Sequence, residues 1–137
     1  MADKTRTSKL LIKPGQALAI LNAPDHYLGL LAPLPDGVTL SQSLDETYDA
    51  VHVFVYHKAD VERLIPAALA AVKPGALLWI MYPKKSGSIK TDITRDTGWE
   101  TVDEAGWLGV TQISIDDTWS ALRFRPRAEI KSLTRKF

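Results

Sequence analysis

The stretch YPKKSGSIKTDITRD, residues 82–96, places lysines, hydroxyls and carboxylates directly after a strongly apolar run. Lys84, Lys85 and Lys90 surround the loop Ser86-Gly87-Ser88. Lysine ammonium groups, flexible glycine backbone and a nearby helix N-terminus can together hold a phosphate or a carboxylate. The spacing differs from that of the Walker phosphate-binding motif, so the pattern predicts an anion site without naming its ligand.

A structural role is the alternative for the same lysines. Lys84 and Lys85 could pair across the edge of a sheet with Asp116 and Asp117 and hold a C-terminal hairpin in place. Exposed ion pairs of this kind contribute about 0 to 1 kcal/mol each. The sequence leaves both interpretations open.

Other polar residues give weaker indications of a function. His57, with Asp60 three residues later, is a candidate general base or a residue that caps a loop. Asp92 is expected to cap a following helix. The nearby aspartates lack the dense spacing of a calcium-binding loop, so no metal site is expected. The sequence has no cysteine and no Gly-x-Ser-x-Gly motif, so it offers no familiar nucleophile.

The elements that would position these residues alternate between strands and helices. Apolar runs predict buried strands over residues 16–21, 48–56 and 76–82, with a short edge strand at 38–40 and a hairpin over 109–126. Helices are expected over residues 26–32, 59–72 and 92–105, with Pro66 either kinking the second or opening a new segment. This order predicts an α/β fold, a three-layer sandwich with a mainly parallel sheet and a C-terminal antiparallel hairpin.

In open α/β sheets, ligands bind outside the carboxyl ends of the parallel strands. Trp119 could line a pocket there or simply cover the sheet edge. Applying the rule to each predicted strand gives one set of candidate ligand-binding residues: Asn22, Asp25, His57, Lys84, Lys85, Ser86, Ser88, Asp92, Arg95, Asp116, Asp117 and Trp119.

Composition limits the organisation of the chain. Its 137 residues, 45% of them hydrophobic, fit one α/β domain over residues 10–126, with a flexible leader at 1–9 and a basic tail at 127–137. No signal peptide or membrane-spanning run is visible, and the absence of cysteine is compatible with a cytoplasmic location. The tail is interpreted as solvated, and nucleic acid is not expected as a partner.

The segments YDAVHVFV and AAVKPGALLWIMY resemble the fourth strand, its helix and the fifth strand of class I methyltransferases. LLIKPGQ, YPKKSGSIKTDITRDTGW and SIDDTWSALRFR resemble an uncharacterised bacterial family of small domains with this layout. The resemblance implies a shortened Rossmann-like, methyltransferase-like fold. Methyltransferases carry a glycine-rich loop after the first strand and an acidic residue after the second. This chain has LNAPD and SQS at those places, so no cofactor is expected.

Two function hypotheses follow. The first is a non-catalytic domain that binds an anionic small molecule or a protein partner at the carboxyl edge of the sheet. The second is a reduced S-adenosylmethionine-dependent methyltransferase relative that uses the same edge. A homodimer formed through an exposed edge strand is compatible with both.

Overall fold

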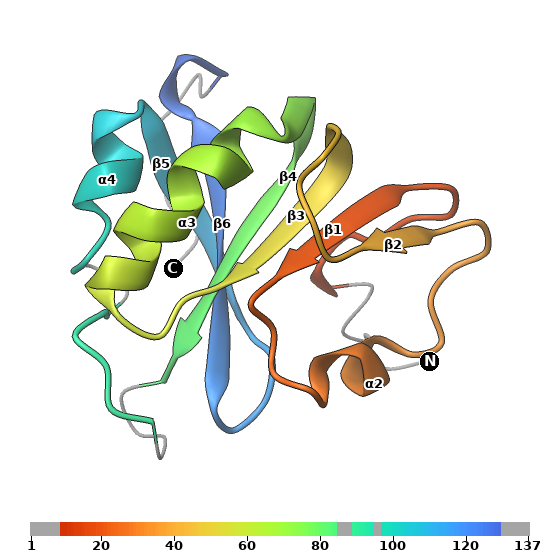
Figure 1. Ribbon diagram of the computed structural model, residues 1–137, viewed down its shortest axis with the longest axis horizontal. Coiled ribbons are helices and arrows are strands. Elements are labelled where there is room, and N and C mark those ends of the chain that lie inside the picture. The colour runs from red at the N-terminus through yellow and green to blue at the C-terminus, as the bar shows by residue number, and fades with distance from the viewer. Residues whose placement is uncertain (1–8, 85–88, 95–96, 130–137) are drawn as a thin grey trace.

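The computed structural model describes residues 9–84, 89–94 and 97–129. Strands, helices and one terminal 3-10 turn follow one another along the chain (Figure 1). Their bounds are β1 Ala17–Leu21, α2 Tyr27–Leu31, β2 Thr39–Ser41, β3 Tyr48–Phe54, α3 Lys58–Ala70, β4 Val72–Pro83, α4 Glu100–Glu104, β5 Trp107–Ser114, β6 Trp119–Pro126 and η1 Arg127–Glu129.

The strands form one six-stranded sheet in the order β2-β1-β3-β4-β6-β5. β2, β1, β3 and β4 pair in parallel, whereas β6 is antiparallel to both β4 and β5. β5 therefore points in the same direction as β4, and the β5–β6 turn lies at the carboxyl edge, at the bottom of Figure 1. The predicted mainly parallel α/β fold with a C-terminal antiparallel hairpin is confirmed.

Alternating residues of the strands fill two apolar cores, one on each face of the sheet. Val51 and Val53 of β3 pack toward α3 and α4, whereas Ala50 and Phe54 pack toward α2 and the N-terminal segment. β3 is buried on both faces because it is a central parallel strand, which explains its nearly continuous apolar sequence. Trp79 anchors the N-terminal segment on the second face, where its indole N–H donates to the Leu10 carbonyl at 3.0 Å.

The structure corrects two predicted helices. The helix expected over residues 92–105 is limited to α4, and Thr94 and Thr97 form an isolated antiparallel bridge before it. Gly98 has a φ of +102°, a backbone conformation outside any helix, which explains why the helix begins only after it. Pro66 lies within the single helix α3, and residues 73–75, expected to stop that helix, belong instead to β4.

Residues 42–47 alone connect β2 to β3, passing over β1 on the α3 face. Figure 1 shows this short link crossing in front of β1. Parallel strands are usually joined by a longer crossover that contains a helix. On the α3 face, β1 is therefore covered by this loop, through Leu44, rather than by a helix.

Candidate functional site

The loop after β1 is fixed to the end of β3. Asn22, the residue after β1, has a φ of +61°, and its side-chain amide donates to the Phe54 carbonyl at 3.0 Å. Asparagine is one of the few non-glycine residues that adopts this left-handed conformation readily. Asp25, further along the loop, is exposed. Asn22 therefore lies at the predicted edge, with its side chain bonded to the neighbouring strand.

The N-terminus of α3 also lies at this edge and is capped by two carboxylates. Asp60 accepts hydrogen bonds from the backbone N–H groups of Tyr56 at 2.8 Å and His57 at 3.3 Å. Asp92 accepts from the backbone N–H of Lys58 at 2.8 Å. The sequence predicts Asp92 as the cap of its own following helix; in the structure it caps α3, 34 residues earlier in the chain. His57 is the exposed N-cap residue of α3.

Asp116 organises the turn between β5 and β6. One of its carboxylate oxygens accepts from the backbone N–H groups of Thr118 and Trp119, both at 2.8 Å. The other oxygen lies 3.3 Å from Nε2 of His26, which joins the hairpin to the segment before α2. Partial burial acts to raise the pKa of Asp116, but these hydrogen bonds outweigh burial and the pKa lies below its ordinary value. Asp117, the next residue, is exposed.

Lys84 is held by the hairpin, but through different groups from those predicted. Its backbone N–H donates to the Thr118 carbonyl at 2.7 Å, and its ammonium donates to the Ser114 hydroxyl at 2.6 Å. Among the described residues it forms no ion pair, so the predicted pairing with Asp116 or Asp117 is wrong for Lys84. The other predicted site residues of this stretch, Lys85, Ser86, Ser88 and Arg95, lie outside the described residues.

Trp119 is a core residue rather than a pocket wall. Its side chain is buried, and its ring meets Phe54 and Tyr56 edge to face, at centroid distances of 4.9 and 5.0 Å. Aromatic pairs favour this geometry because the positive ring edge meets the negative ring face. The carboxyl edge therefore rests on a cluster of packed aromatic rings.

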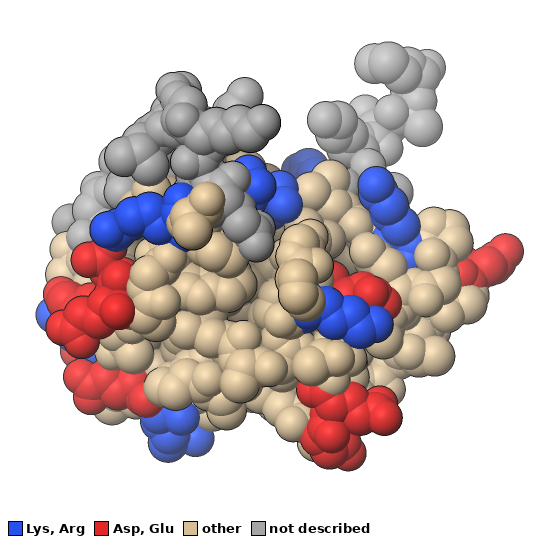
Figure 2. Space-filling view, turned by 90° about the horizontal axis from the view of Figure 1, so that it is seen from above, with Lys and Arg blue, Asp and Glu red and all other residues tan. Residues whose placement is uncertain are grey.

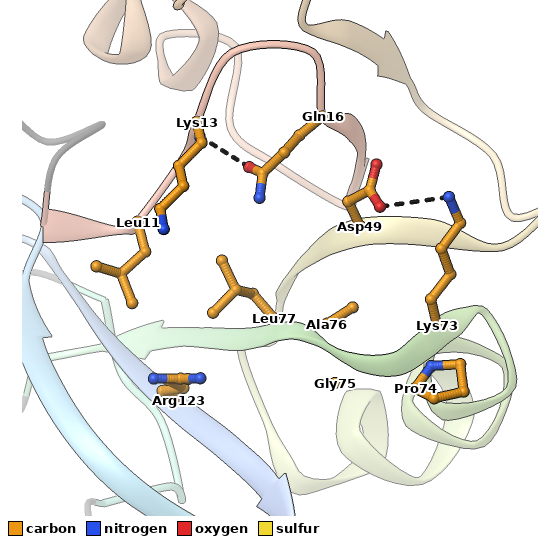
Figure 3. A pocket seen from close by; sticks show the side chains of 10 residues that line it. All are labelled: Leu11, Lys13, Gln16, Asp49, Lys73, Pro74, Gly75, Ala76, Leu77 and Arg123. Carbon is orange, nitrogen blue, oxygen red and sulfur yellow. Dashed lines mark hydrogen bonds and ion pairs between the residues drawn. The ribbon is translucent and has the colours of Figure 1, made fainter.

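A pocket that the sequence did not predict lies at the opposite, amino-terminal edge of the sheet (Figure 3). Its volume is about 390 Å³. It lies on the α2 face between the N-terminal segment and the start of β4. Its lining residues are Leu11, Lys13, Gln16, Asp49, Lys73, Pro74, Gly75, Ala76, Leu77 and Arg123. The clue in the sequence is the turn motif Lys-Pro-Gly, which occurs at residues 13–15 and again at 73–75.

No group of three or more His, Cys, Asp or Glu side chains in the described part of the chain could hold a metal ion. None of the described helices is long and apolar enough to cross a membrane.

No protein-family model and no curated protein sequence matches the chain. Several solved structures, however, have a similar fold. The DhpI–SAH complex superposes with a TM-score of 0.57 at 15% identity, over 84% of this chain and 78% of that one. The ribosomal protein L11 methylase from Lactobacillus delbrueckii subsp. bulgaricus gives 0.53 at 10% identity, over 87% and 73%. The Methanococcus jannaschii fibrillarin pre-rRNA processing protein gives 0.53 at 15% identity, over 90% and 75%.

These neighbours are class I SAM-dependent methyltransferases with a Rossmann-like fold. Their identities to this chain are low, so the likeness describes the arrangement of strands and helices and does not carry an activity. The chain has the fold of class I SAM-dependent methyltransferases.

Proposed function

We propose that this chain is a non-catalytic binding domain built on the methyltransferase fold, which binds an anionic small molecule at the carboxyl edge of its sheet. The observation that carries this proposal is the contrast between the carboxylates and the lysines of that edge. Asp60, Asp92 and Asp116 accept hydrogen bonds from backbone N–H groups. These carboxylates keep their negative charge, but their oxygens are bonded to the protein's own backbone.

The lysines of the same edge are in the opposite situation. Lys58, Lys84 and Lys90 have no carboxylate partner among the described residues, and the ammonium of Lys84 donates only to a neutral hydroxyl. The exposed carboxylates here are Asp25, Asp92 and Asp117. Lysines without ion-pair partners favour an anion, and a phosphate or carboxylate is the chemical class they would recognise.

The groups that usually hold S-adenosylmethionine are replaced by groups with structural bonds. Asn22, in the loop where methyltransferases have glycines, ties β1 to the Phe54 carbonyl. Ser41, at the end of β2, accepts from the hydroxyl of Tyr48 at 3.3 Å, where an acidic residue would bind ribose hydroxyls. These replacements support a binding role without methyl transfer.

A reduced methyltransferase relative is the second candidate. Its support is the shared fold, together with the positive φ of Asn22 directly after β1, the conformation that a glycine would provide in the cofactor loop. This candidate requires that S-adenosylmethionine binds at the carboxyl edge.

A thermal-shift experiment separates the two candidates. The chain is heated with nucleotides, sugar phosphates, S-adenosylmethionine and S-adenosylhomocysteine, each well above its expected dissociation constant, where binding adds about 2.7 kcal/mol of stability at a hundredfold excess. The proposal expects stabilisation by a phosphorylated compound that is lost in Lys84→Ala. Ser114→Ala is the matched control, because it removes the Lys84 hydrogen bond but leaves the charge.

Stabilisation by S-adenosylmethionine and S-adenosylhomocysteine alone would favour the second candidate. Equal stabilisation of Lys84→Ala and the unmodified chain would show that the anion does not bind at this edge. No stabilisation by any compound would contradict both candidates and direct attention to protein partners.

A further inference from the structure

The pocket at the amino-terminal edge is built by irregular backbone. Between the pairs Tyr48↔Val72 and Ala50↔Leu77, β4 advances five residues while β3 advances two. The extra residues of β4 bulge away from β3 and form one wall of the pocket. Leu11, on the facing wall, has a φ of +62° although it is not glycine. Backbone conformations of this kind are rare and tend to occur at ligand sites.

The pocket lining carries more positive than negative charge. Lys13, Lys73 and Arg123 line it, against the single carboxylate of Asp49. Figure 2 looks at the molecule from this side; Lys and Arg side chains lie both around the middle of the face and at its margins, and most Asp and Glu side chains lie toward the margins.

Each carboxylate oxygen of Asp49 already has a partner within the protein. One of its oxygens accepts from the backbone N–H of Ala17 at 2.8 Å, and the other lies 3.3 Å from the ammonium of Lys73. The hydrogen bond from Ala17 lowers the pKa of this carboxyl, and Lys73 lowers it further. Asp49 therefore stays ionised and holds Lys73 beside the pocket. The side chains of Lys13 and Arg123 have no ion-pair partner in the described part of the chain.

The guanidinium of Arg123 is the charged group of the pocket with the least complete set of partners. It projects from β6 onto the same face as Ala121, and its Nε is buried without a hydrogen-bond partner among the described residues. Burial lowers the pKa of the guanidinium, and the neighbouring charge of Arg125 lowers it further. A half-buried guanidinium with no ion-pair partner among the described residues favours a bound anion.

The remaining lining is apolar or neutral. The side chains of Leu11 and Leu77 line the pocket between Lys13 and Arg123, and Leu11 is 39% exposed. Gln16 accepts from the backbone N–H of Lys13 through its Oε1, and Figure 3 shows its amide nitrogen turned toward the middle of the pocket. A volume of about 390 Å³ suits a small organic molecule.

We infer that this pocket binds a small organic anion, whose carboxylate or phosphate group contacts Arg123 and whose apolar body lies against Leu11 and Leu77. Arginine binds both groups in a bidentate manner because its planar guanidinium matches their geometry. This site is separate from the carboxyl edge, so it does not depend on the function proposed there.

The test is a titration followed by the backbone amide signals of the isotope-labelled full chain in nuclear magnetic resonance. The probes are benzoate, phenyl phosphate, inorganic phosphate and the neutral analogue benzamide, each at millimolar concentration. The expected result is that benzoate or phenyl phosphate shifts the amide signals of Leu11, Gly75 and Ala76, while benzamide does not. Binding of only benzoate, or only phenyl phosphate, identifies the anionic group that the site prefers.

Variants test which residues bind the anion. Arg123→Gln is expected to weaken binding about tenfold to a hundredfold, because it removes a charge-assisted hydrogen bond. Arg63→Gln, on the exposed face of α3, is expected to bind as the unmodified chain does. If Arg123→Gln fails to fold, Lys13→Gln replaces it, since Lys13 is exposed and its Nζ forms no ion pair among the described residues.

Three outcomes would overturn the inference. They are the absence of shifts with every anion, equal binding of benzamide and benzoate, and unchanged affinity in Arg123→Gln or its replacement. Loss of binding in Lys84→Ala but not in Arg123→Gln would assign the anion to the carboxyl edge instead.

Discussion

The hydroxyl of Tyr27 lies 2.8 Å from Nδ1 of His52, and both side chains are buried. Tyr27 belongs to α2 and His52 to the central strand β3, so this contact joins the short helix to the sheet. The other ring nitrogen, Nε2, has no hydrogen-bond partner among the described residues. Burial lowers the pKa of His52 to about 3, so the imidazole is neutral at pH 7.

The free energy of unfolding is expected to fall as the pH is lowered from about 6.5 toward 3. In this range the unfolded chain protonates His52 with its ordinary pKa, while the folded chain keeps it neutral, so acid favours unfolding. The slope approaches about 1.4 kcal/mol per pH unit. Urea unfolding measured between pH 7 and 5 checks this, because carboxylates titrate mainly below that range. A His52→Leu variant with the same slope would contradict the assignment.

Tyr27→Phe is expected to destabilise the fold by about 1 to 3 kcal/mol, because it leaves Nδ1 of His52 buried without a partner. The double variant Tyr27→Phe/His52→Leu removes both polar groups and is expected to regain part of this loss. Urea unfolding of the two single variants and the double variant forms a complete mutant cycle. Strictly additive losses would show that the hydrogen bond contributes nothing.

Asp92→Ala is expected to lower the free energy of unfolding by about 1 kcal/mol, the usual cost of losing a helix cap. Asp92 supplies the acceptor for the backbone N–H of Lys58 at the first turn of α3. Asp117→Ala is the matched control, since Asp117 is exposed and forms no hydrogen bond among the described residues, and it should change stability by less than about 0.5 kcal/mol. Chemical denaturation compares the two variants. Equal effects would mean that Asp92 does not cap α3.

Asp116→Ala is expected to cost about 1 to 3 kcal/mol, because the backbone N–H groups of Thr118 and Trp119 lose their acceptor. Asp116→Asn keeps one side-chain oxygen and should retain most of the stability. His26→Ala removes only the exposed contact and should cost less than about 1 kcal/mol. Thermal unfolding ranks the three variants. If His26→Ala were as harmful as Asp116→Ala, the ion pair rather than the turn would stabilise the hairpin.

The sequence by itself determined which stretches of the chain form the main strands and how these follow one another along the chain. Apolar runs of strand length, separated by turn residues, identify β1, β3 and β4, because buried parallel strands must be apolar on both faces. β-branched residues on either side of Asp116-Asp117-Thr118 identify the hairpin. The same local rules also placed several polar residues at the carboxyl edge, since that edge follows from strand direction alone.

Only the tertiary structure decided which groups these polar residues contact. Asp92 caps a helix 34 residues away, and Lys84 donates to Ser114 rather than to an aspartate, because distant backbone groups compete for each side chain. The pocket at the amino-terminal edge was not predicted from the sequence either. Lys13, Lys73 and Arg123 are far apart along the chain, and a bulge in β4 and the path of the N-terminal segment bring them together. Local propensity has no information about such long-range contacts, which form only when the sheet and its two cores assemble.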